Sequence, residues 1–410
     1  MPRSLGGRAA LVLVAIGLAA AAQRWVEDPL RHGRAIGTLP RRNLAMAGAL
    51  SLIVATASLG IGATTAGALQ GTVTTDVATD ERELEEILGG LASPSPVATI
   101  PAASPGTTST PGASATPAAS PDPDQTAGPA ALPATRGGPV PAGLRPSIAE
   151  ARADFPLPYH DGCSVEQDET ESGPCTYGDL SSSTTIVLMG DSHARAWFPA
   201  VNRLATERGW RLVTLTKSAC ASADFSQWNA SLKRVYSECN EWRESTYRRL
   251  EAERPALVLL ANSRKFSAVG PDGSTILAGA ARTEAWREGG AKTLARLTPV
   301  AGHVVLIGDT PRSAFDVPVC LSDHPDDTLA CATPFDRSVN LTWLAEERSA
   351  ARRGGAGFVD PTPWVCPTGP CPAVIGNFMV LRDEHHLTTP FSGALWRRLG
   401  DALQVLTAKR

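Results

Sequence analysis

The sequence lacks two features that mark whole classes of protein: a surplus of basic residues and a glycine-rich phosphate loop. Lys and Arg number 38 against 41 Asp and Glu, a formal net charge of −3, and a chain without a basic surface is not expected to bind nucleic acid. Without a phosphate loop, no nucleotide cofactor is implied. Only 19% of the 410 residues are charged. The apolar residues are concentrated in two runs near the N-terminus, which argues against a purely soluble cytoplasmic protein.

Cysteine is absent from the first 162 residues, whereas eight cysteines follow. They form four close pairs, and the simplest disulfide pattern joins the members of each pair: Cys163–Cys175, Cys220–Cys239, Cys320–Cys331 and Cys366–Cys371. A metal site is the alternative. However, no C-x2-C pair has a matching second half, and most of the seven histidines lie far from the cysteines in sequence. We favour disulfides, which predict an oxidising compartment outside the cytoplasm for this part of the chain.

The two apolar runs predict membrane-spanning helices. Residues 43–75 are long enough to cross a bilayer, and residues 9–23 are short for it. Five arginines lie between the runs, and the first charges after the second run are acidic, so the positive-inside rule places the chain after residue 75 outside the cytoplasm. We favour a transmembrane helical hairpin over residues 1–75. A cleaved signal peptide at the first run and a single uncleaved anchor are the alternatives.

A linker is predicted between this anchor and the folded part. Residues 93–142 contain twelve prolines, three charged residues and no aromatic residue. Such a segment cannot bury enough apolar surface to offset the entropy lost on folding. We therefore predict a disordered, Pro-rich extracytoplasmic linker over residues 76–144, with a coil-like span of roughly 40 Å. Its acidic start, residues 80–91, could continue a helix out of the membrane.

Residues 145–410 show short apolar runs that alternate with amphipathic stretches, a pattern typical of α/β domains. The runs predict a doubly wound, parallel, five-stranded sheet with helices on both faces. The expected strands are 185–189, 211–215, 256–261, 303–307 and 357–359, and the expected helices are 199–208, 229–253, 281–297, 341–353 and 390–406. Pro199 and Pro390 each suit a first helical turn. Ligands are expected beyond the carboxyl ends of the strands.

Two short motifs lie at that edge. Gly190-Asp191-Ser192-His193 follows the first strand, where a serine hydroxyl and its backbone N–H could serve acyl transfer. Asp383 and His386 precede the last helix, and residues three apart on one helical turn share a face, so the carboxylate could orient the imidazole toward a serine. Each motif has a plainer interpretation, an ordinary turn for the first and a solvated charged loop for the second.

Together, the order Ser, then Asp and His before the final helix, resembles the SGNH (GDSL-type) hydrolase superfamily. The GDSHA and D-x-x-H-L blocks, Thr310-Pro311 and the cysteine pairs Cys220/Cys239 and Cys366/Cys371 resemble the SGNH domain fused to acyltransferase-3 (AT3) membrane proteins, which O-acetylate surface polysaccharides. The segment 26–31 and the second apolar run are similar to the end of that family's membrane part. The resemblance covers about residues 8–75 and 160–408. Most of the multi-helix membrane acyltransferase domain has no counterpart in this sequence.

The resemblance implies roles for individual residues. Ser192 would be the nucleophile, His386 the general base and Asp383 its orienting carboxylate. The oxyanion hole would use the Ser192 amide and Asn262; the family's glycine has no counterpart in 217–222, so the hole would be atypical. Asn262 could equally be a turn residue. Other roles are expected for four further residues: Asp191 supports the turn, His193 and His385 make structural or substrate contacts, and Trp197 packs in the core rather than stacking on a sugar.

The expected function is that of a membrane-anchored, extracytoplasmic SGNH acyltransferase. It would transfer an acyl group, expected to be acetyl, to hydroxyls of a cell-surface polysaccharide through an acyl-serine. A carbohydrate O-acetyl esterase and a catalytically idle glycan-binding module are the alternatives. The expected partners are the polysaccharide and the membrane. If the sequence is a natural stand-alone version and not a truncated reading frame, a separate multi-helix membrane acyltransferase that supplies the acyl group is expected as well. Neither a metal nor a nucleotide cofactor is implied.

Overall fold

The computed structural model describes residues 79, 81–82, 84–88 and 136–407, with side chains to residue 404. The predicted membrane hairpin and most of the predicted linker lie outside these residues. Among the helices of the described part, none is both long and apolar enough to cross a bilayer.

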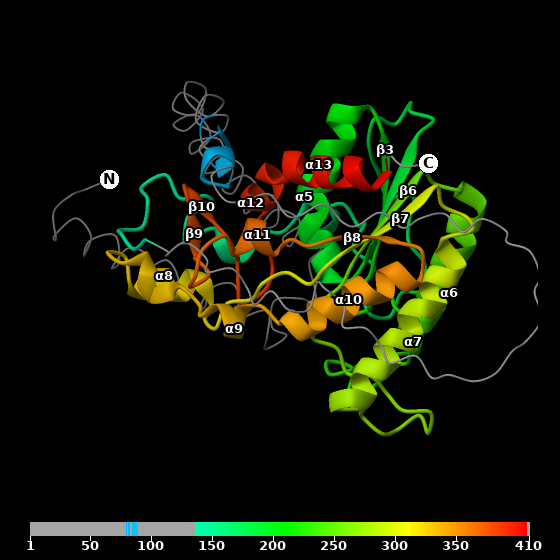
Figure 1. Ribbon diagram of the computed structural model, residues 1–410. Helices are drawn as coiled ribbons and strands as arrows, with labels where there is room; N and C mark the ends of the chain where they lie inside the picture. Colours follow the sequence, from blue (N-terminus) through cyan, green and yellow to red (C-terminus); the bar gives the residue numbers. More distant parts are fainter. Residues whose placement is uncertain (1–78, 80, 83, 89–135, 408–410) are drawn as a thin grey trace, which may run out of the picture. The chain divides into compact units, whose positions relative to one another are not determined.

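The apolar runs form one mixed sheet with the order β1-β3-β2-β6-β7-β8 (Figure 1). The five predicted strands are present and parallel, and their bounds are β2 Thr185–Gly190, β3 Arg211–Thr216, β6 Leu257–Ala261, β7 His303–Ile307 and β8 Gly357–Val359. The doubly wound α/β fold is therefore confirmed. A sixth strand, β1 (Thr176–Gly178), pairs antiparallel with β3 and was not predicted. It has only three half-buried residues, so no apolar run marks it.

Helices cover both faces of the sheet, and alternate side chains of each strand enter one core or the other. Helices α5, α12 and α13 lie on one face and α6, α7 and α10 on the other (Figure 1). In β2, Ile186 and Leu188 belong to the first core, while Val187 and Met189 belong to the second. The bounds are α5 Ser192–Arg208, α6 Ser237–Glu253, α7 Gly279–Leu297, α10 Leu341–Arg353, α12 Thr389–Ala394 and α13 Trp396–Thr407.

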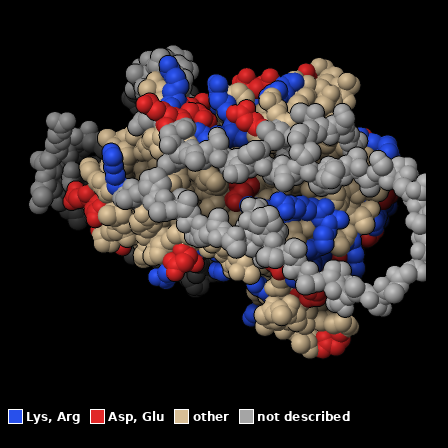
Figure 2. Space-filling model, in the orientation of Figure 1, with Lys and Arg blue, Asp and Glu red and all other residues tan. Residues whose placement is uncertain are grey.

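Short elements fill the connections between these layers. They are α8 Val317–Asp323, α9 Phe335–Ser338, α11 Thr362–Val365, the 3-10 turns η3 Ala151–Ala153, η4 Leu157–Tyr159 and η5 Thr328–Cys331, and the strand pairs β4 Trp228–Asn229 with β5 Arg234–Val235 and β9 Val374–Ile375 with β10 Phe378–Met379. Basic and acidic side chains are interspersed over the described residues visible in Figure 2, in keeping with a net charge near zero.

Three predicted helix boundaries are wrong. Helix α5 begins at Ser192 because Asp191 caps it, and Pro199 lies inside the helix instead of at its start. Helix α6 begins at Ser237 because the preceding residues form the β4–β5 pair. The predicted last helix is divided at Leu395 into α12 and α13. Pro390 does lie in the first turn of its helix, as predicted.

The four predicted disulfides are all present: Cys163–Cys175, Cys220–Cys239, Cys320–Cys331 and Cys366–Cys371. Each disulfide joins one cysteine to the next cysteine along the sequence, so each closes a single loop of the chain. Such bonds persist in oxidising compartments, which places this domain outside the cytoplasm.

Two segments before residue 145 also contact the domain. Leu84 and Leu88 are fully buried in the core beneath α5 and α13, and Glu85 pairs with Arg398 at 3.2 Å. Leu144 is buried in the same core, and the N–H of Val140 donates to the carbonyl of Pro325. Ordered contacts of the described chain therefore begin before the segment 145–410.

Candidate active site

Ser192 lies where β2 ends and α5 begins. Gly190 closes the strand with φ of 149°, and a Cβ at this position would overlap the carbonyl oxygen of Ala261 on the adjacent strand β6. Only glycine fits such a turn. As the first residue of α5, Ser192 presents its hydroxyl at the carboxyl edge of the sheet, and its N–H is not used within the helix.

Asp191 holds this turn in place. Its Oδ1 accepts a hydrogen bond from the N–H of His193 (2.8 Å), which caps α5, and its Oδ2 accepts one from the N–H of Ser263 (2.9 Å) just after β6. Burial raises the pKa of Asp191 to about 6, and these two hydrogen bonds oppose that shift. The predicted turn-supporting role agrees with this geometry.

The structure brings Ser192, His386 and Asp383 together. His386 Nε2 lies 2.9 Å from Ser192 Oγ, and His386 Nδ1 lies 2.6 Å from Asp383 Oδ2. Because a carboxylate can only accept, Nδ1 carries the proton and Nε2 offers its lone pair to the serine hydroxyl. Burial raises the pKa of Asp383, but the hydrogen bond and the charge of His386 outweigh burial, so its pKa lies below the ordinary value. This arrangement can deprotonate the serine.

The prediction that Asp383 and His386 share a helical turn is wrong. Residues 381–387 form a loop closed by a bridge between Leu381 and Leu387. Asp383 Oδ1 accepts hydrogen bonds from the N–H groups of both His385 and His386, each at 2.8 Å. Asp side chains favour such turns over helix interiors because they bind their own backbone. The side chains still meet because the turn, like a helix, brings residues three apart together.

The predicted oxyanion residue Asn262 follows β6 and is buried. Its Oδ1 accepts from the N–H of Ser222 (2.7 Å) and its Nδ2 donates to the Ser222 hydroxyl (2.9 Å). An amide nitrogen carries two protons, so one remains for another acceptor. At the position after β3, where the family has glycine, the N–H of Lys217 donates to the carbonyl of Gly190. That amide is therefore engaged in holding the turn.

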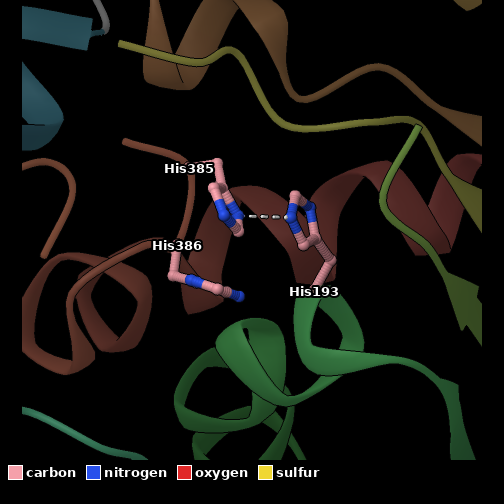
Figure 3. A group of neighbouring side chains, drawn as sticks. All are labelled: His193, His385 and His386. Atoms are coloured by element: carbon pink, nitrogen blue, oxygen red, sulfur yellow. Dashed lines mark hydrogen bonds between the residues drawn. The ribbon is translucent and has the colours of Figure 1, made fainter. Parts of the chain in front are cut away.

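A second group of polar side chains lies beside Ser192 and was not predicted as a group. His385 Nδ1 lies 3.0 Å from His193 Nε2 (Figure 3). On the other side of its ring, His193 Nδ1 lies 3.4 Å from Asp309 Oδ1. Asp309 follows β7 and is held by Arg264 at 2.6 Å. The side chains of His193 and Asp309 are each 2% exposed. We call Asp309, His193 and His385 the inner chain, and Asp383, His386 and Ser192 the outer chain.

Burial sets the protonation of the inner chain. It lowers the pKa of His193 well below its ordinary value and that of His385 to about 3, with the charge of His386 acting in the same direction. Burial, followed by the repulsion of Asp309, raises the pKa of Glu347 well above its ordinary value. Burial also raises the pKa of Asp309, and the charges of Arg312 and Arg264 oppose that shift. Because Asp309 accepts hydrogen bonds from both the N–H and the guanidinium of Arg264, Asp309 is the carboxylate of this pair and Glu347 holds the proton.

The three histidines are a group in the described part of the chain that could hold a metal ion, since one nitrogen from each lies within 4.8 Å of the others. Zinc is bound by histidine nitrogens at about 2.0–2.1 Å. A metal here would take the His386 lone pair that faces Ser192, so it would block the outer chain.

Trp197 is fully buried and packs edge-on against Trp364, in agreement with the packing interpretation.

Sequence reasoning missed Asp309, Arg264 and Glu347. Asp309 stands two residues after the strand β7, at the edge where ligands of a doubly wound sheet bind. That placement was the available signal for it. Arg264 follows Asn262 by two residues and could have been found in the same way. Glu347 lies within α10, and nothing in its sequence surroundings marks it as buried.

The sequence and the fold both resemble those of known proteins. The family model described as the SGNH domain (fused to AT3 domains) matches residues 162–399. Among solved structures, the chain is similar to the periplasmic domain of a lipopolysaccharide acetyltransferase from Salmonella ser. Paratyphi A, at 18% identity over 55% of this chain and 85% of that one, with a TM-score of 0.41.

Two further structures are similar at lower scores. A GDSL-like lipase from Bacteroides thetaiotaomicron shows 14% identity over 55% of this chain and 89% of that one, with a TM-score of 0.30. A catalytic mutant of an acetylxylan esterase from Geobacillus stearothermophilus shows 13% identity over 55% and 94%, also with a TM-score of 0.30. No curated protein matches this chain.

Proposed function

This chain belongs to the family of SGNH domains fused to AT3 domains, and from that premise we propose that it transfers an acyl group, acetyl, to hydroxyls of a cell-surface polysaccharide. The domain matched by the family model, residues 162–399, is an SGNH-type acyltransferase or esterase. The observation that carries the proposal is the hydrogen-bonded order Asp383, His386, Ser192, at 2.6 and 2.9 Å. The proposed reaction has two steps that share this chain of side chains.

In the first step, Ser192 becomes acylated. His386 Nε2 takes the hydroxyl proton as Oγ attacks the carbonyl carbon of the acyl donor, and Asp383 stabilises the imidazolium through Nδ1–H. The negative charge that develops on the carbonyl oxygen is met by the N–H of Ser192, at the N-terminus of α5, and by the second proton of Asn262 Nδ2. The imidazolium then protonates the leaving group, which departs and leaves acyl-Ser192.

In the second step, the acyl group leaves the serine. A sugar hydroxyl gives its proton to His386 Nε2 and attacks the acyl carbon. The bond from that carbon to Ser192 Oγ breaks, and the imidazolium returns the proton to Oγ. Water in place of the sugar would give hydrolysis, so the transferase and the esterase differ in how well the alcohol is held and how well water is kept out.

The surroundings of the domain support transfer over hydrolysis. The four disulfides accord with an extracytoplasmic site, where the polysaccharide is found. The predicted hairpin over residues 1–75 would anchor the chain in the membrane, across which an acyl group must come from the cytoplasm. We propose that a membrane acyltransferase supplies it.

The test is turnover of p-nitrophenyl acetate by the full-length chain, with and without an added oligosaccharide, together with mass spectrometry of the trapped enzyme. A transferase forms acyl-Ser192 and yields acetylated sugar at the expense of free acetate. Acyl-enzyme with hydrolysis that is indifferent to sugar would assign the esterase instead. Neither acyl-enzyme nor turnover would leave the glycan-binding alternative.

A further inference from the structure

The inner chain fixes the protons on its two imidazoles. Asp309 is a carboxylate and can only accept, so the nitrogen that faces it, His193 Nδ1, carries a proton. Because His193 is neutral, its Nε2 then has a lone pair and must accept from His385 Nδ1–H across the 3.0 Å contact. His385 is neutral as well, which leaves the lone pair of His385 on Nε2.

This remaining nitrogen is open. His385 Nε2 has no hydrogen-bond partner among the described residues. Some side-chain atoms of these residues are both buried and without a partner, but His385 Nε2 is not one of them. It is therefore reachable from solvent. The His385 ring lies 4.0 Å, centroid to centroid, from that of His386, whose Nε2 faces Ser192 (Figure 3). The site thus presents two adjacent imidazole rings, each with a lone pair on Nε2, and the outer chain uses only one of these lone pairs.

We infer that His385 Nε2 binds a second hydroxyl of the acceptor, so that the acceptor is a vicinal diol. The inference rests on the proposed function. The reacting hydroxyl has a single proton and gives it to His386 Nε2, so it cannot also donate to His385. The neighbouring hydroxyl keeps its proton and donates it to His385 Nε2. Water has no second hydroxyl, so the interaction favours the sugar over water.

Burial makes His385 suited to this role. A pKa of about 3 keeps the imidazole neutral at any pH at which the enzyme would work, so its lone pair is always available. For the same reason it is too weak a base to compete with His386 for the reacting proton. Asp309 and His193 hold the ring, and they act as positioning residues.

The experiment compares two small alcohols, ethylene glycol and 2-methoxyethanol, as acceptors for the full-length chain with p-nitrophenyl acetate as donor. The two differ in whether a second hydroxyl can donate. The measured quantity is the ratio of acetylated alcohol to free acetate. Because both products come from one acyl-enzyme, this ratio does not depend on how fast the serine is acylated. Ethylene glycol has two equivalent hydroxyls that can attack and 2-methoxyethanol has one, so the ratio is compared per attacking hydroxyl. On that basis we expect it to be about three- to ten-fold higher with ethylene glycol, which corresponds to one hydrogen bond.

Two substitutions separate acceptor binding from a merely structural role. In His385→Asn, the amide nitrogen can replace Nδ1 and keep the bond to His193, but nothing replaces Nε2. In His385→Gln, the amide oxygen can replace Nε2 as an acceptor. We expect the asparagine variant to lose the preference for ethylene glycol, and the glutamine variant to keep most of it. His324→Asn is the control for the same chemical change at an exposed site and is expected to keep the full preference.

The outcomes distinguish this inference from the proposed function. An asparagine variant that keeps the preference, or a glutamine variant that loses as much as the asparagine variant, would overturn the diol site. An equal ratio for both alcohols with the unsubstituted chain would do the same, while acyl-Ser192 still formed. Absence of any acyl-enzyme in the unsubstituted chain would refute the proposed function itself, and with it the acceptor site.

Discussion

The outer and inner chains both begin on a carboxylate that is followed by an imidazole, and they differ in burial. His386, the imidazole of the outer chain, is adjacent in sequence to His385, the last imidazole of the inner chain. The outer chain is partly exposed and ends on a hydroxyl, whereas the inner chain begins on the 2%-exposed Asp309 and ends on an open nitrogen. Burial keeps the inner imidazoles neutral, so the inner chain can hold a group but not exchange its proton. The comparison separates chemistry from positioning.

The largest expected effect comes from removing the end of the outer chain. Ser192→Ala should lower turnover of p-nitrophenyl acetate by about 10⁶-fold, because no acyl-enzyme can form. Loss of the trapped acyl peptide in the mass spectrum checks the cause. If acyl-enzyme persisted in this variant, the inner chain would have a nucleophilic role of its own and would not serve for positioning alone.

Asp383→Asn should lower kcat by about 10³- to 10⁴-fold. The asparagine oxygen can still accept from the N–H groups of His385 and His386, which keeps the loop in shape. Its Nδ2 protons, however, face His386 Nδ1 and force that proton onto Nε2, where it points at the serine. Steady-state kinetics with an unchanged circular dichroism spectrum would check this. A loss of less than about ten-fold would mean that the tautomer is not set by Asp383.

Asp309→Asn should act mainly on stability. The substitution leaves Arg264, whose side chain is 17% exposed, without its buried carboxylate partner, and the expected loss in the free energy of unfolding is about 3 kcal/mol. Denaturant unfolding measures it. The matched control is Asp360→Asn, which removes the partner of the more exposed Arg348 and should cost less than about 1 kcal/mol. Equal losses in the two variants would show that burial of the inner chain has no energetic consequence.

The smallest expected effect is a pH dependence of stability. The pKa of His385 is about 3 in the folded protein and about 6.5 when unfolded, so the unfolded state binds more protons between these values. Its contribution to stability is full above about pH 6.5 and is lost as the pH falls toward 3. His385→Asn should therefore flatten the fall in stability between about pH 6.5 and 5, by less than about 1.4 kcal/mol per pH unit because the ring is partly exposed.

The measurement for that prediction is the difference in the unfolding free energy between variant and unsubstituted chain at each pH. A difference is needed because Asp191, with a pKa raised to about 6, acts in the opposite direction: its contribution rises as the pH falls through that range. An unchanged slope in the His385→Asn variant would place the imidazole in a more solvated environment than the structure gives it.

The sequence predicted what depends on short-range pattern. Strands such as β6 and β7 are buried on both faces and appear as continuous apolar runs, so their positions could be read directly. The outer chain could also be predicted because Asp383 and His386 are close in sequence and match a family motif. The short strand β1 and the interior position of Pro199 depend on tertiary contacts, which no local pattern records.

The inner chain could not be predicted for a related reason. Asp309, His193 and His385 come from the turn after β7, the first turn of α5 and the loop before α12, and only the sheet order β2-β6-β7 brings the first two together. Its chemistry also depends on burial, which a sequence does not state. A rule that collects every polar residue just after a parallel strand would have found Asp309 and Arg264, but not Glu347.

The edge strand β1 has a practical consequence. Strand β1 covers the outer edge of β3. Cys175, the residue immediately before β1, is joined to Cys163 by a disulfide, and its carbonyl accepts a hydrogen bond from the N–H of Thr214 in β3. An uncovered strand edge is a template for pairing with other chains. Recombinant material made in a reducing cytosol would lack this tie and is expected to be prone to aggregation, so secretion of the chain during expression is the preferable route to homogeneous protein.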